Sequence, residues 1–386
     1  MTAAIIDVKS APDARDVVHR AVQALAEGKL VVFPTETVYG LAASALDAGA
    51  VQRMLEVKGR HAGHPLTLAI KSADEAADFA PSLDALGWRL ARRCWPGPVT
   101  LVLADNHPDS LRFQLPQRVQ EAVVPCGSIG LRVPAHQLIL ESLRLLPGPV
   151  ALTSCNREGE PDSVDGRGAA QAMGAAVDLI LDDGPCQFGQ PSSVVEVKHN
   201  KLKILREGVV SAATLQRLSS CMVLFVCTGN TCRSPMAELL ARKFLSSELG
   251  CPIEQLEDHG VSVASAGIAA MAGGRATSEA VQVMRERNLD LNPHASQPLS
   301  DRLVRYADLI LAMTEGHRQA ILERWPSAAS RTRLINEGQG DVADPIGGSV
   351  EMYRRCASQL ELAMRPHLKA LLHTRPNFDE AERNRS

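Results

Sequence analysis

The sequence predicts an α/β protein built from two domains. Short apolar runs, typical of buried strands, alternate along the chain with amphipathic stretches typical of helices. The chain has 386 residues, which exceeds the usual size of one domain, and 45% of them are apolar, which suffices for two cores. After a short join at 213–221, the apolar run MVLFV at 222–226 begins a second α/β pattern. We therefore expect one domain over 10–212 and a second over 222–374.

The elements can be assigned in order along each domain. A helix is expected from about Asp13 to Gly28, where apolar side chains recur on one stripe, and KLVVF at 29–33 indicates a buried strand. In the second domain, strands are expected at 222–226, 261–267 and 308–314. Helices are expected near 235–247, 276–288 and 350–372.

Composition narrows the class of protein. The formal net charge is −3, so the chain has no basic excess for a broad nucleic-acid surface, although small anionic ligands need only a few cations. No apolar run is long enough for a membrane helix, and residues 1–20 are too charged for a signal peptide. Nine cysteines without a CxxC pair favour neither a zinc cage nor a disulfide framework. We expect a cytoplasmic protein without a membrane partner or a metal site, and with a disordered tail over 375–386.

The segment CTGNTCRS, from Cys227 to Ser234, lies between an apolar run and the helical stretch PMAELLARKF. A loop that enters a helix N-terminus turns its backbone N–H groups inward, where they favour a thiolate and bind phosphoryl oxygens. Gly229 permits a tight turn, and Arg233, six residues after Cys227, can clamp two oxygens. The plainer interpretation of Cys227 is a small buried hydrophobe at a strand end. The succession of strand, Gly-Asn, Arg-Ser-Pro and helix favours a nucleophile.

Phosphoryl transfer through a cysteine also needs an acid for the leaving group and a base for water. The segment DVADPIGGS supplies Asp344 before Pro345, 117 residues after Cys227. An Asp-Pro pair followed by two glycines is also a common turn, so this segment alone does not identify an acid.

Together, CTGNTCRS and DVADPIGGS resemble the low-molecular-weight protein tyrosine phosphatase family, over about residues 222–372. The resemblance implies a central parallel sheet flanked by helices, and no cofactor. It makes Cys227 the nucleophile, Arg233 the clamp on the transition state, and Asp344 first the acid and then the base. Asn230 and Ser234 would support the loop and the thiolate. The phosphate loop implied in this way comprises Thr228, Gly229, Asn230, Thr231, Cys232 and Ser234.

Two loop residues bear on regulation and substrate. In this family a cysteine at the position of Cys232 can form a reversible disulfide with the nucleophile, and the alternative is a residue that fills space. Thr231 and DPIGGS resemble the protein-arginine phosphatase branch, whereas tyrosine-directed members generally have an aliphatic residue at this loop position. Ile346 departs from the phenylalanine that this branch often has. Phosphorylated proteins, on arginine or tyrosine, would be the substrates.

Two alternatives for this half stay open. One is a general phosphatase of low specificity, in which Thr231 only packs. The other is an arsenate reductase, which needs further redox cysteines, and only Cys251 and Cys356 lie downstream.

The first two hundred residues carry polar segments at the ends of predicted strands, where α/β sheets build ligand sites. Each of them alone can be explained as a junction, a turn or an exposed strand. The segments are PTETVYGLA (34–42), VKGRHAGHPLTL (57–68), WPGPVTLVL (95–103), LRVP (131–134), ALTSCNREG (151–159), QPSSVVEV (190–197) and LREG (205–208).

In this order the segments resemble the YrdC-like threonylcarbamoyl-AMP synthase family, over roughly residues 10–210, which implies a twisted α/β domain. That family condenses L-threonine, bicarbonate and ATP into threonylcarbamoyl-adenylate and pyrophosphate, for a modification of tRNA adenosine 37. Mg²⁺ would accompany ATP, and tRNA-modification proteins would be partners. Thr35 and Tyr39 would hold threonine. The cations for the triphosphate and the polar contacts to nucleotide would be Lys58, Arg60, Arg132, Arg206, Ser154, Asn156 and Ser192.

The segments also depart from the family pattern. The family often has TSAN followed by SG, where this chain has TSCN followed by Arg157, Glu158 and Gly159. His61 replaces the proline that usually follows the arginine of the KxR motif. His61 and His64 are three residues apart, but they lack further ligands nearby, so a solvated loop is preferred to a metal site. The alternative for this half is a non-catalytic nucleotide- or RNA-binding module that regulates the phosphatase.

Overall fold

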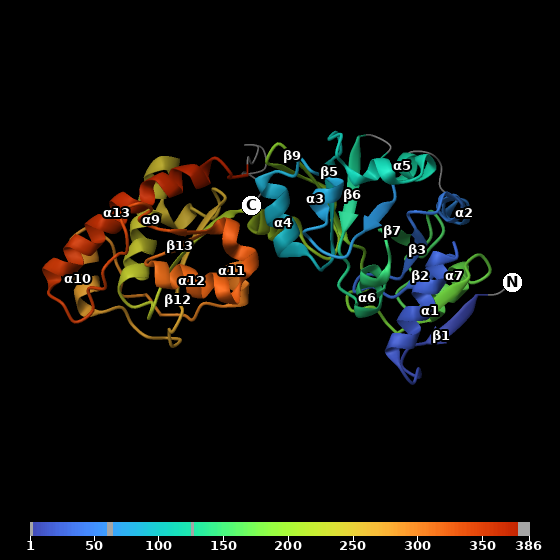
Figure 1. Cartoon of the computed structure of the whole chain (residues 1–386), viewed down its shortest axis with the longest axis horizontal. Helices are drawn as coiled ribbons and strands as arrows, with labels where there is room; N and C mark the ends of the chain where they lie inside the picture. Colours follow the sequence, from blue (N-terminus) through green and yellow to red (C-terminus); the bar gives the residue numbers. More distant parts are fainter. Residues whose placement is uncertain (1–2, 60–64, 125–126, 377–386) are drawn as a thin grey trace. The chain divides into compact units, whose positions relative to one another are not determined.

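The computed structural model describes residues 3–59, 65–124 and 127–376. The chain divides into two compact units between Leu218 and Ser219. Each unit has its own sheet (Figure 1). Each also has its own apolar clusters. Within the described ranges, no helix is both long and apolar enough to cross a membrane. The α/β class with two domains is confirmed, while the domain limits at 10–212 and 222–374 stay predictions.

The first unit contains a ten-stranded mixed sheet in the order β1-β8-β2-β3-β7-β4-β6-β5-β9-β10. Its strands are β1 (Ala4–Asp7), β2 (Val31–Phe33), β3 (Gly40–Ser44), β4 (Thr67–Ala69), β5 (Val99–Ala104), β6 (Ser128–Arg132), β7 (Val150–Ser154), β8 (Leu179–Asp182), β9 (Ser193–Lys198) and β10 (Lys201–Arg206). β3 and β7 are antiparallel, and Gly40 pairs with Ser154. The segments PTETVYG and TSCN, far apart in the sequence, therefore meet at one place in the sheet.

Helices cover both faces of this sheet, which explains why its central strands are continuous apolar runs. Adjacent residues of β2 alternate between the faces, since Val31 and Phe33 belong to a cluster with α1 and α6, while Val32 belongs to another cluster. The helices are α1 (Ala14–Ala26), α2 (Ala48–Lys58), α3 (Ala76–Phe79), α4 (Ala85–Cys94), α5 (Gln117–Val123), α6 (Gln137–Leu145), α7 (Gly166–Met173) and α8 (Ala212–Ser219), with a 3₁₀ turn η1 (Leu111–Gln114).

The second unit contains a four-stranded parallel sheet in the order β12-β11-β13-β14. Its strands are β11 (Cys221–Cys227), β12 (Val261–Gly267), β13 (Leu309–Ala312) and β14 (Thr332–Leu334). β11 lies between two neighbours and is buried throughout. Because β11 is central and parallel to its neighbours, the loop that follows it lies at the carboxyl edge of the sheet, where α/β folds place ligands.

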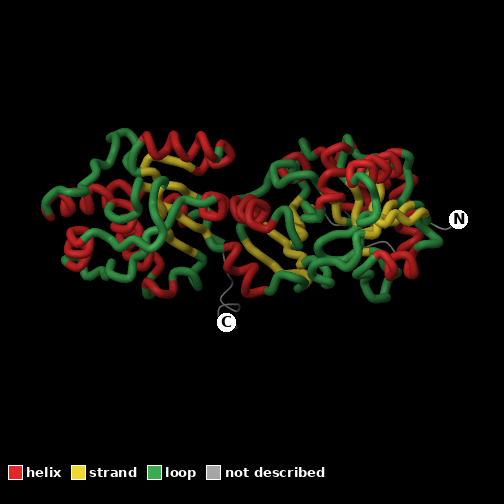
Figure 2. Tube along the Cα trace, turned by 90° about the horizontal axis from the view of Figure 1, so that it is seen from below, coloured by secondary structure: helices red, strands yellow, loops and turns green. Residues whose placement is uncertain are grey.

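The two faces of β11 pack against different helices. Val223 and Phe225 share one apolar cluster with α9, α10 and α13, and Leu224 and Val226 share another with α11 and α12. Figure 2 shows helices around the strands in each unit. The helices are α9 (Arg233–Leu249), α10 (Ser278–Arg285), α11 (Asp301–Tyr306), α12 (Glu315–Arg324) and α13 (Val350–Leu372), with 3₁₀ turns η2 (Ile253–Gln255) and η3 (Pro326–Arg331).

Most expected elements are present, with differences at their ends. Asp13 is the N-cap of α1 rather than its first residue, because its side chain accepts a hydrogen bond from the Arg15 N–H. α10 is shorter than 276–288, since Thr277 caps its start and Asn288 has a left-handed φ of 59°. The short join at 213–221 is largely the helix α8. Of the tail expected to be disordered over 375–386, residues 377–386 lie outside the described residues. Arg375 is placed, since its N–H donates to Leu372 O and its Nη1 donates to His259 O, each at 3.2 Å.

Candidate active sites

The thiol loop joins the carboxyl end of β11 to the N-terminus of α9. Cys227 is the last residue of β11, and its Sγ accepts a hydrogen bond from the Asn230 backbone N–H at 3.2 Å. The Ser234 Oγ lies 3.0 Å from the same sulfur. Cys227 is only 3% exposed, so these contacts replace much of the solvation that a sulfur anion would have in water.

Asn230 holds the shape of the loop. Its φ is 54°, in the left-handed region that asparagine tolerates better than most residues. The side-chain Nδ2 donates to Ser234 Oγ and Ser265 Oγ, each at 2.9 Å, and Oδ1 accepts from the Gln297 N–H at 2.9 Å. His294 Nε2 lies 2.8 Å from the backbone oxygen of Asn230. The left-handed residue of this loop is therefore Asn230.

Gly267, the last residue of β12, permits the close approach of the thiol loop. A Cβ atom on this residue would lie 2.4 Å from Thr228 O and 2.9 Å from Asn230 N, which a side chain cannot do without moving the backbone. The segment after Gly267 stays beside the loop, because Ile268 N donates to Cys227 O at 3.0 Å.

Arg233 and Asp344 form an ion pair between the start of α9 and the Asp-Pro loop. The Arg233 guanidinium also donates from Nη1 to Val342 O at 3.1 Å. Its side chain is 5% exposed, whereas that of Asp344 is 39% exposed. The carboxylate is thus the partner that solvent or a ligand can reach.

His317 connects the thiol loop to the N-terminus of α12. Its Nε2 lies 2.9 Å from Thr228 Oγ1, and its Nδ1 lies 2.7 Å from Thr314 Oγ1. Burial, with a smaller effect of Arg233, lowers the pKa of His317 below its usual 6.5. A neutral imidazole therefore joins the two threonine hydroxyls at neutral pH.

Cys232 lies among hydroxyl groups. Its Sγ is 3.5 Å from Tyr353 OH and 3.6 Å from both Thr231 Oγ1 and Thr277 Oγ1. Burial raises the pKa of Tyr353 to about 12, so this hydroxyl is protonated. Cys356 is also buried, and burial raises its pKa to about 12, which makes it a poor redox partner.

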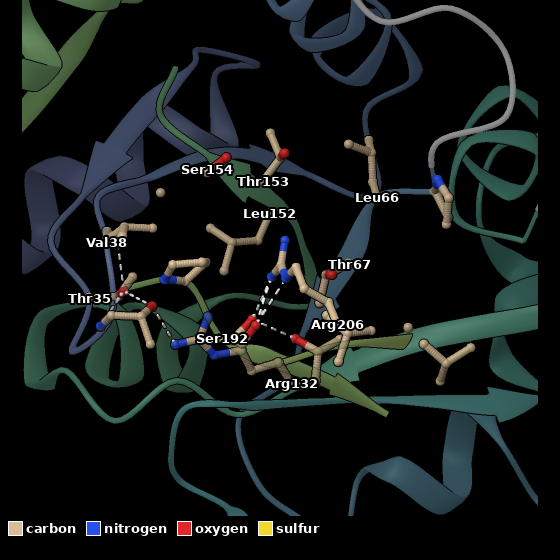
Figure 3. Close-up of a pocket in the computed structure, with 18 of the residues that line it drawn as sticks. Thr35, Val38, Leu66, Thr67, Arg132, Leu152, Thr153, Ser154, Ser192 and Arg206 are labelled. Carbon is tan, nitrogen blue, oxygen red and sulfur yellow. Dashed lines mark hydrogen bonds between the residues drawn. The ribbon is translucent and has the colours of Figure 1, made fainter. Parts of the chain in front are cut away.

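The first unit contains a cavity of about 350 Å³ that is lined largely by residues of its sheet. Figure 3 shows Ser154 and Thr153 at one side of it, with Ser192, Arg206 and Arg132 opposite. The walls come from β3, β4, β5, β6, β7, β9 and β10. Of the predicted threonine- and ATP-binding residues, those that line it are Thr35, Tyr39, Arg132, Ser154, Ser192 and Arg206.

Arg132 is held in place by residues of the PTETVYG segment. Its Nη2 donates to Glu36 Oε1 at 2.7 Å and to Thr37 Oγ1 at 2.9 Å, and its Nε donates to Gly97 O at 3.3 Å. The second carboxylate oxygen of Glu36 accepts from the Ala135 N–H at 2.9 Å. A buried arginine whose Nε and Nη2 have fixed partners presents the rest of its guanidinium in one orientation.

Ser192 and Arg206 form a second polar group in the cavity. Arg206 Nη2 donates to Ser192 O at 2.8 Å and to Ser192 Oγ at 3.2 Å, and Thr100 Oγ1 lies 3.1 Å from the same hydroxyl. These contacts connect β10, the start of β9 and β5 on one side of the cavity.

Lys58 does not line the cavity but supports its wall. The Nζ atom donates to Ser154 O at 2.8 Å, to Asn156 O at 2.6 Å and to Asn156 Oδ1 at 2.7 Å. Three acceptors match the three donors of an ammonium group, and Lys58 is 3% exposed. Ser154 Oγ donates to Asn156 Oδ1 at 2.6 Å, so Lys58 holds the TSCN turn in this arrangement.

The two residues expected to hold threonine make internal contacts. Thr35 Oγ1 lies 2.8 Å from Thr37 Oγ1 and donates to Val38 O at 2.6 Å. Tyr39 OH donates to Gly184 O at 2.8 Å, and burial raises its pKa above the usual 10. The tyrosine hydroxyl therefore connects the PTETVYG segment to the backbone at Gly184. Thr35 lies at the cavity wall.

Arg60, His61 and His64 lie outside the described residues. Cys155, which replaces the usual alanine of TSAN, is fully buried in the core, so the fold accommodates this departure. Across the described ranges, no group of three or more His, Cys, Asp or Glu side chains is arranged to hold a metal ion.

Sequence reasoning missed several residues that complete these sites. Glu36 and Thr37 stand inside the PTETVYG segment itself and could have been noted as polar residues at a strand end. His317, Ser265 and His294 lie far along the chain from the thiol loop. No spacing rule connects any of them to it.

Comparison with known proteins assigns each unit to a family. Residues 23–208 match the Sua5–YciO–YrdC family, whose description is "Telomere recombination". Residues 222–377 match the family of low molecular weight phosphotyrosine protein phosphatases. The chain thus belongs to both families, one in each half, as its motifs predict.

The relatives of the first half are named threonylcarbamoyl-AMP synthases. The chain is 34% identical over 194 residues to one from Pyrococcus abyssi, a match that covers 50% of this chain and 54% of that protein. The chain therefore spans about half the length of this relative. A putative synthase from Mycobacterium leprae is 35% identical over 195 residues, covering 50% of this chain and 84% of that protein. A crystal structure of P. abyssi Sua5 complexed with L-threonine has 25% identity and a TM-score of 0.50, and the match covers 68% of this chain and 92% of that chain.

The relatives of the second half are named protein-arginine-phosphatases. One from Bacillus subtilis is 40% identical over 153 residues, which is 39% of this chain and 95% of that protein. Both families therefore contain enzymes, and both resemblances seen in the motifs are confirmed.

Proposed function

We propose that the second unit is a protein-arginine phosphatase that uses Cys227 as its nucleophile. The observation that carries this proposal is the double contact of the Cys227 sulfur with the Asn230 N–H and the Ser234 hydroxyl, at the N-terminus of α9. Such contacts favour a thiolate. The name of the Bacillus subtilis relative and the threonine at position 231 support arginine as the phosphorylated residue.

The reaction would proceed in two steps. The Cys227 thiolate attacks phosphorus, an S–P bond forms, and the P–N bond to the guanidinium nitrogen breaks while Asp344 gives that nitrogen a proton. Asp344 then takes a proton from water, whose oxygen attacks phosphorus. The S–P bond breaks, which releases inorganic phosphate and restores the thiolate. Arg233 and the loop N–H groups bind the non-bridging oxygens in both steps, so no cofactor is required.

For the first unit we propose the synthesis of threonylcarbamoyl-adenylate from L-threonine, bicarbonate and ATP. The observation that supports it is that six of the expected residues line one cavity, with Arg132 and Arg206 among them. Thr35 would contact threonine, and the arginines and the hydroxyls of Ser154 and Ser192 would contact the nucleotide. The threonine amine attacks the carbon of bicarbonate, a C–N bond forms and water leaves. The resulting carboxylate oxygen attacks the α-phosphorus, a P–O bond forms, and the bond from that phosphorus to pyrophosphate breaks.

The cavity is also compatible with the Mg²⁺ that would accompany ATP. Glu196 and the hydroxyls of Thr100 and Ser192 line it, and oxygen atoms of this kind are the ligands that Mg²⁺ prefers. The ion would be held mainly by the triphosphate, since no ligand cluster is present among the described residues. Its charge would offset part of the charge of the triphosphate.

Partners and compartment follow from the same proposal. Phosphorylated proteins would be substrates of the second unit, and tRNA-modification proteins would receive the adenylate from the first. We place both activities in the cytoplasm, a reducing compartment in which thiols persist, and the eight cysteines within the described ranges are all unbridged.

One experiment on the full chain tests both activities. Pyrophosphate release is measured with ATP and bicarbonate, with and without L-threonine, and dephosphorylation is measured on protein that carries phosphoarginine or phosphotyrosine. We expect threonine-dependent release, a preference for phosphoarginine, and loss of dephosphorylation alone in Cys227→Ser. Release that ignores threonine contradicts the synthase, and nucleotide binding without turnover supports the regulatory alternative. Equal rates on both phosphoproteins support a general phosphatase.

A further inference from the structure

A continuous series of hydrogen bonds leads from Glu238, on α9, to the sulfur of Cys227. Glu238 Oε2 accepts from Ser265 Oγ at 2.7 Å, and Ser265 Oγ accepts from Asn230 Nδ2 at 2.9 Å. The same Nδ2 donates to Ser234 Oγ at 2.9 Å, and Ser234 Oγ lies 3.0 Å from Cys227 Sγ. Each interior member of the series is fully buried, so water does not replace any of these partners.

The direction of proton donation in this series is set at its outer end. An ionised carboxylate only accepts hydrogen bonds. Glu238 Oε1 already accepts from Arg242 Nη2 at 2.8 Å, so both of its oxygens are occupied by donors. Ser265 must therefore direct its single proton to Glu238, which leaves a lone pair of its oxygen for the Asn230 amide.

The same reasoning continues to the sulfur. The Gln297 N–H donates to Asn230 Oδ1, so the amide nitrogen of Asn230 must face the two serines. Ser234 accepts from that nitrogen and keeps its own proton for a different acceptor. The two acceptors in reach are Cys227 Sγ at 3.0 Å and Ala266 O at 3.4 Å. The shorter contact directs the proton of Ser234 to the sulfur, and a donor to sulfur favours its anion.

We propose that Glu238 is a positioning residue for the nucleophile, which acts through Ser265, Asn230 and Ser234 to keep a hydroxyl proton directed at the Cys227 sulfur. This inference rests on the proposed role of Cys227. Glu238 is suited to this role, because its side chain is 18% exposed and keeps an ion pair with Arg242, whereas the groups between it and the sulfur are buried.

A glutamine at this position cannot replace the carboxylate. Arg242 and Ser265 donate to different oxygens of Glu238, and a glutamine replaces one of these oxygens with an NH₂ donor. If the amide NH₂ group faces Ser265, the serine proton must turn toward Asn230 Nδ2. Two donors would then face each other across the 2.9 Å gap between Ser265 and Asn230, which forces Asn230 away from Ser234.

The test measures how pH controls alkylation of Cys227 by iodoacetate in the full chain, with Cys227→Ser as the background. We expect Glu238→Gln to move the midpoint of the rate profile to higher pH by about one unit, because a hydrogen bond to a charged group is weakened. Glu248→Gln, an exposed position on the same helix, is the control and should leave the midpoint in place. In a Ser234→Ala background, Glu238→Gln should add no further shift.

Other outcomes overturn the proposal. A midpoint that stays in place shows that Glu238 does not act on the sulfur, and a move to lower pH shows that it acts only as a negative charge. An equal shift with and without the Ser234 hydroxyl shows a route that bypasses the series. Glu238→Asp is the second variant, to be used if Glu238→Gln does not fold. Its carboxylate is one methylene farther from Ser265, so the midpoint should also move to higher pH. Because alkylation needs no phosphorylated substrate, an inactive phosphatase with the expected shifts contradicts only the proposed function.

Discussion

The Arg233 guanidinium is paired with the Asp344 carboxylate, although the two residues are 111 positions apart in the chain. The pair holds the Asp-Pro loop against the thiol loop. In the proposed mechanism, a phosphoryl group on Arg233 would compete with Asp344 for the Nη2 donor. The Asp344 side chain is 39% exposed and that of Arg233 is 5% exposed, so we expect the carboxylate to be the partner that gives way.

Asp344→Asn is expected to lower kcat for dephosphorylation by about 10²- to 10⁴-fold, the usual contribution of an acid–base group. Binding of the phosphate analogue vanadate should not weaken, because Arg233 loses a competing carboxylate. Asp341→Asn is the control, since Asp341 accepts from the Glu315 N–H and does not contact Arg233 in the described contacts. A variant with near-normal kcat would remove Asp344 from the acid–base role.

Thr231→Ile is expected to shift substrate preference toward phosphotyrosine. The Thr231 hydroxyl belongs to the thiol loop. Among the described side-chain hydrogen bonds, its one partner is the Cys232 thiol, at 3.6 Å. A change of this size at a pocket wall alters discrimination by about 10- to 200-fold. The measurement is the ratio of kcat/KM for phosphoarginine and phosphotyrosine in the same protein. An unchanged ratio would show that Thr231 only packs.

Lys58→Ala is expected to slow threonine-dependent pyrophosphate release and also to destabilise the first unit. The substitution removes the ammonium donor from all three acceptors, but Asn156 Oδ1 keeps the Ser154 hydroxyl and Ser154 O keeps the Asn156 N–H. Among the described contacts Asn156 O loses its donor, and a buried acceptor left unpaired costs about 1–3 kcal/mol. Lys29→Ala is the control, because Lys29 is a half-exposed lysine paired with Glu27. Urea unfolding monitors stability beside the assay. Normal stability with lost activity would indicate direct contact with the triphosphate instead of support of the TSCN turn.

His317 is expected to make the second unit less stable in acid. Its pKa in the folded protein lies below the usual 6.5, so the unfolded chain binds more protons at intermediate pH. The contribution of neutral His317 is complete above about pH 6.5 and is lost as pH falls through the lower folded value. Urea unfolding between pH 7.5 and about 5 should show a smaller loss in His317→Asn than in the wild type.

The exposed His19 provides the comparison for this measurement, and His19→Asn should leave the pH dependence as it is in the wild type. If His317→Asn has the same acid loss as the wild type, a different group is responsible. Dephosphorylation by His317→Asn should also fall, since Thr228 loses the partner that connects it to α12.

A site could be predicted from the sequence to the extent that its residues are close together in the chain. The thiol loop is continuous in the chain, and a strand, a turn and a helix N-terminus are local features with known signatures. Cys227 could therefore be assigned from local features, whereas the supporting roles of Asn230 and Ser234 came from the family resemblance. The YrdC-like segments are each short, and only their common order indicated that they share one cavity.

The role expected for Lys58 shows where sequence reasoning is limited. A lysine near a predicted nucleotide site suggests a phosphate ligand. The structure shows its ammonium donating to three protein oxygens, two of them from Asn156, 98 positions away, while the role at the triphosphate stays a prediction. Backbone oxygens have no sequence signature, so this arrangement could not be read from residue types.

The sequence by itself determined the division into two α/β domains, the family of each and the order of the thiol loop, because periodicity and local motifs carry this information. Only the tertiary structure decided which distant groups meet. Asp344 reaches Arg233, His317 reaches Thr228 and Glu36 reaches Arg132 because strands that are remote in sequence become neighbours at the ends of a sheet. The physical reason is that hydrogen bonds and ion pairs depend on distances of a few ångströms, which chain spacing does not specify once the backbone has crossed the sheet.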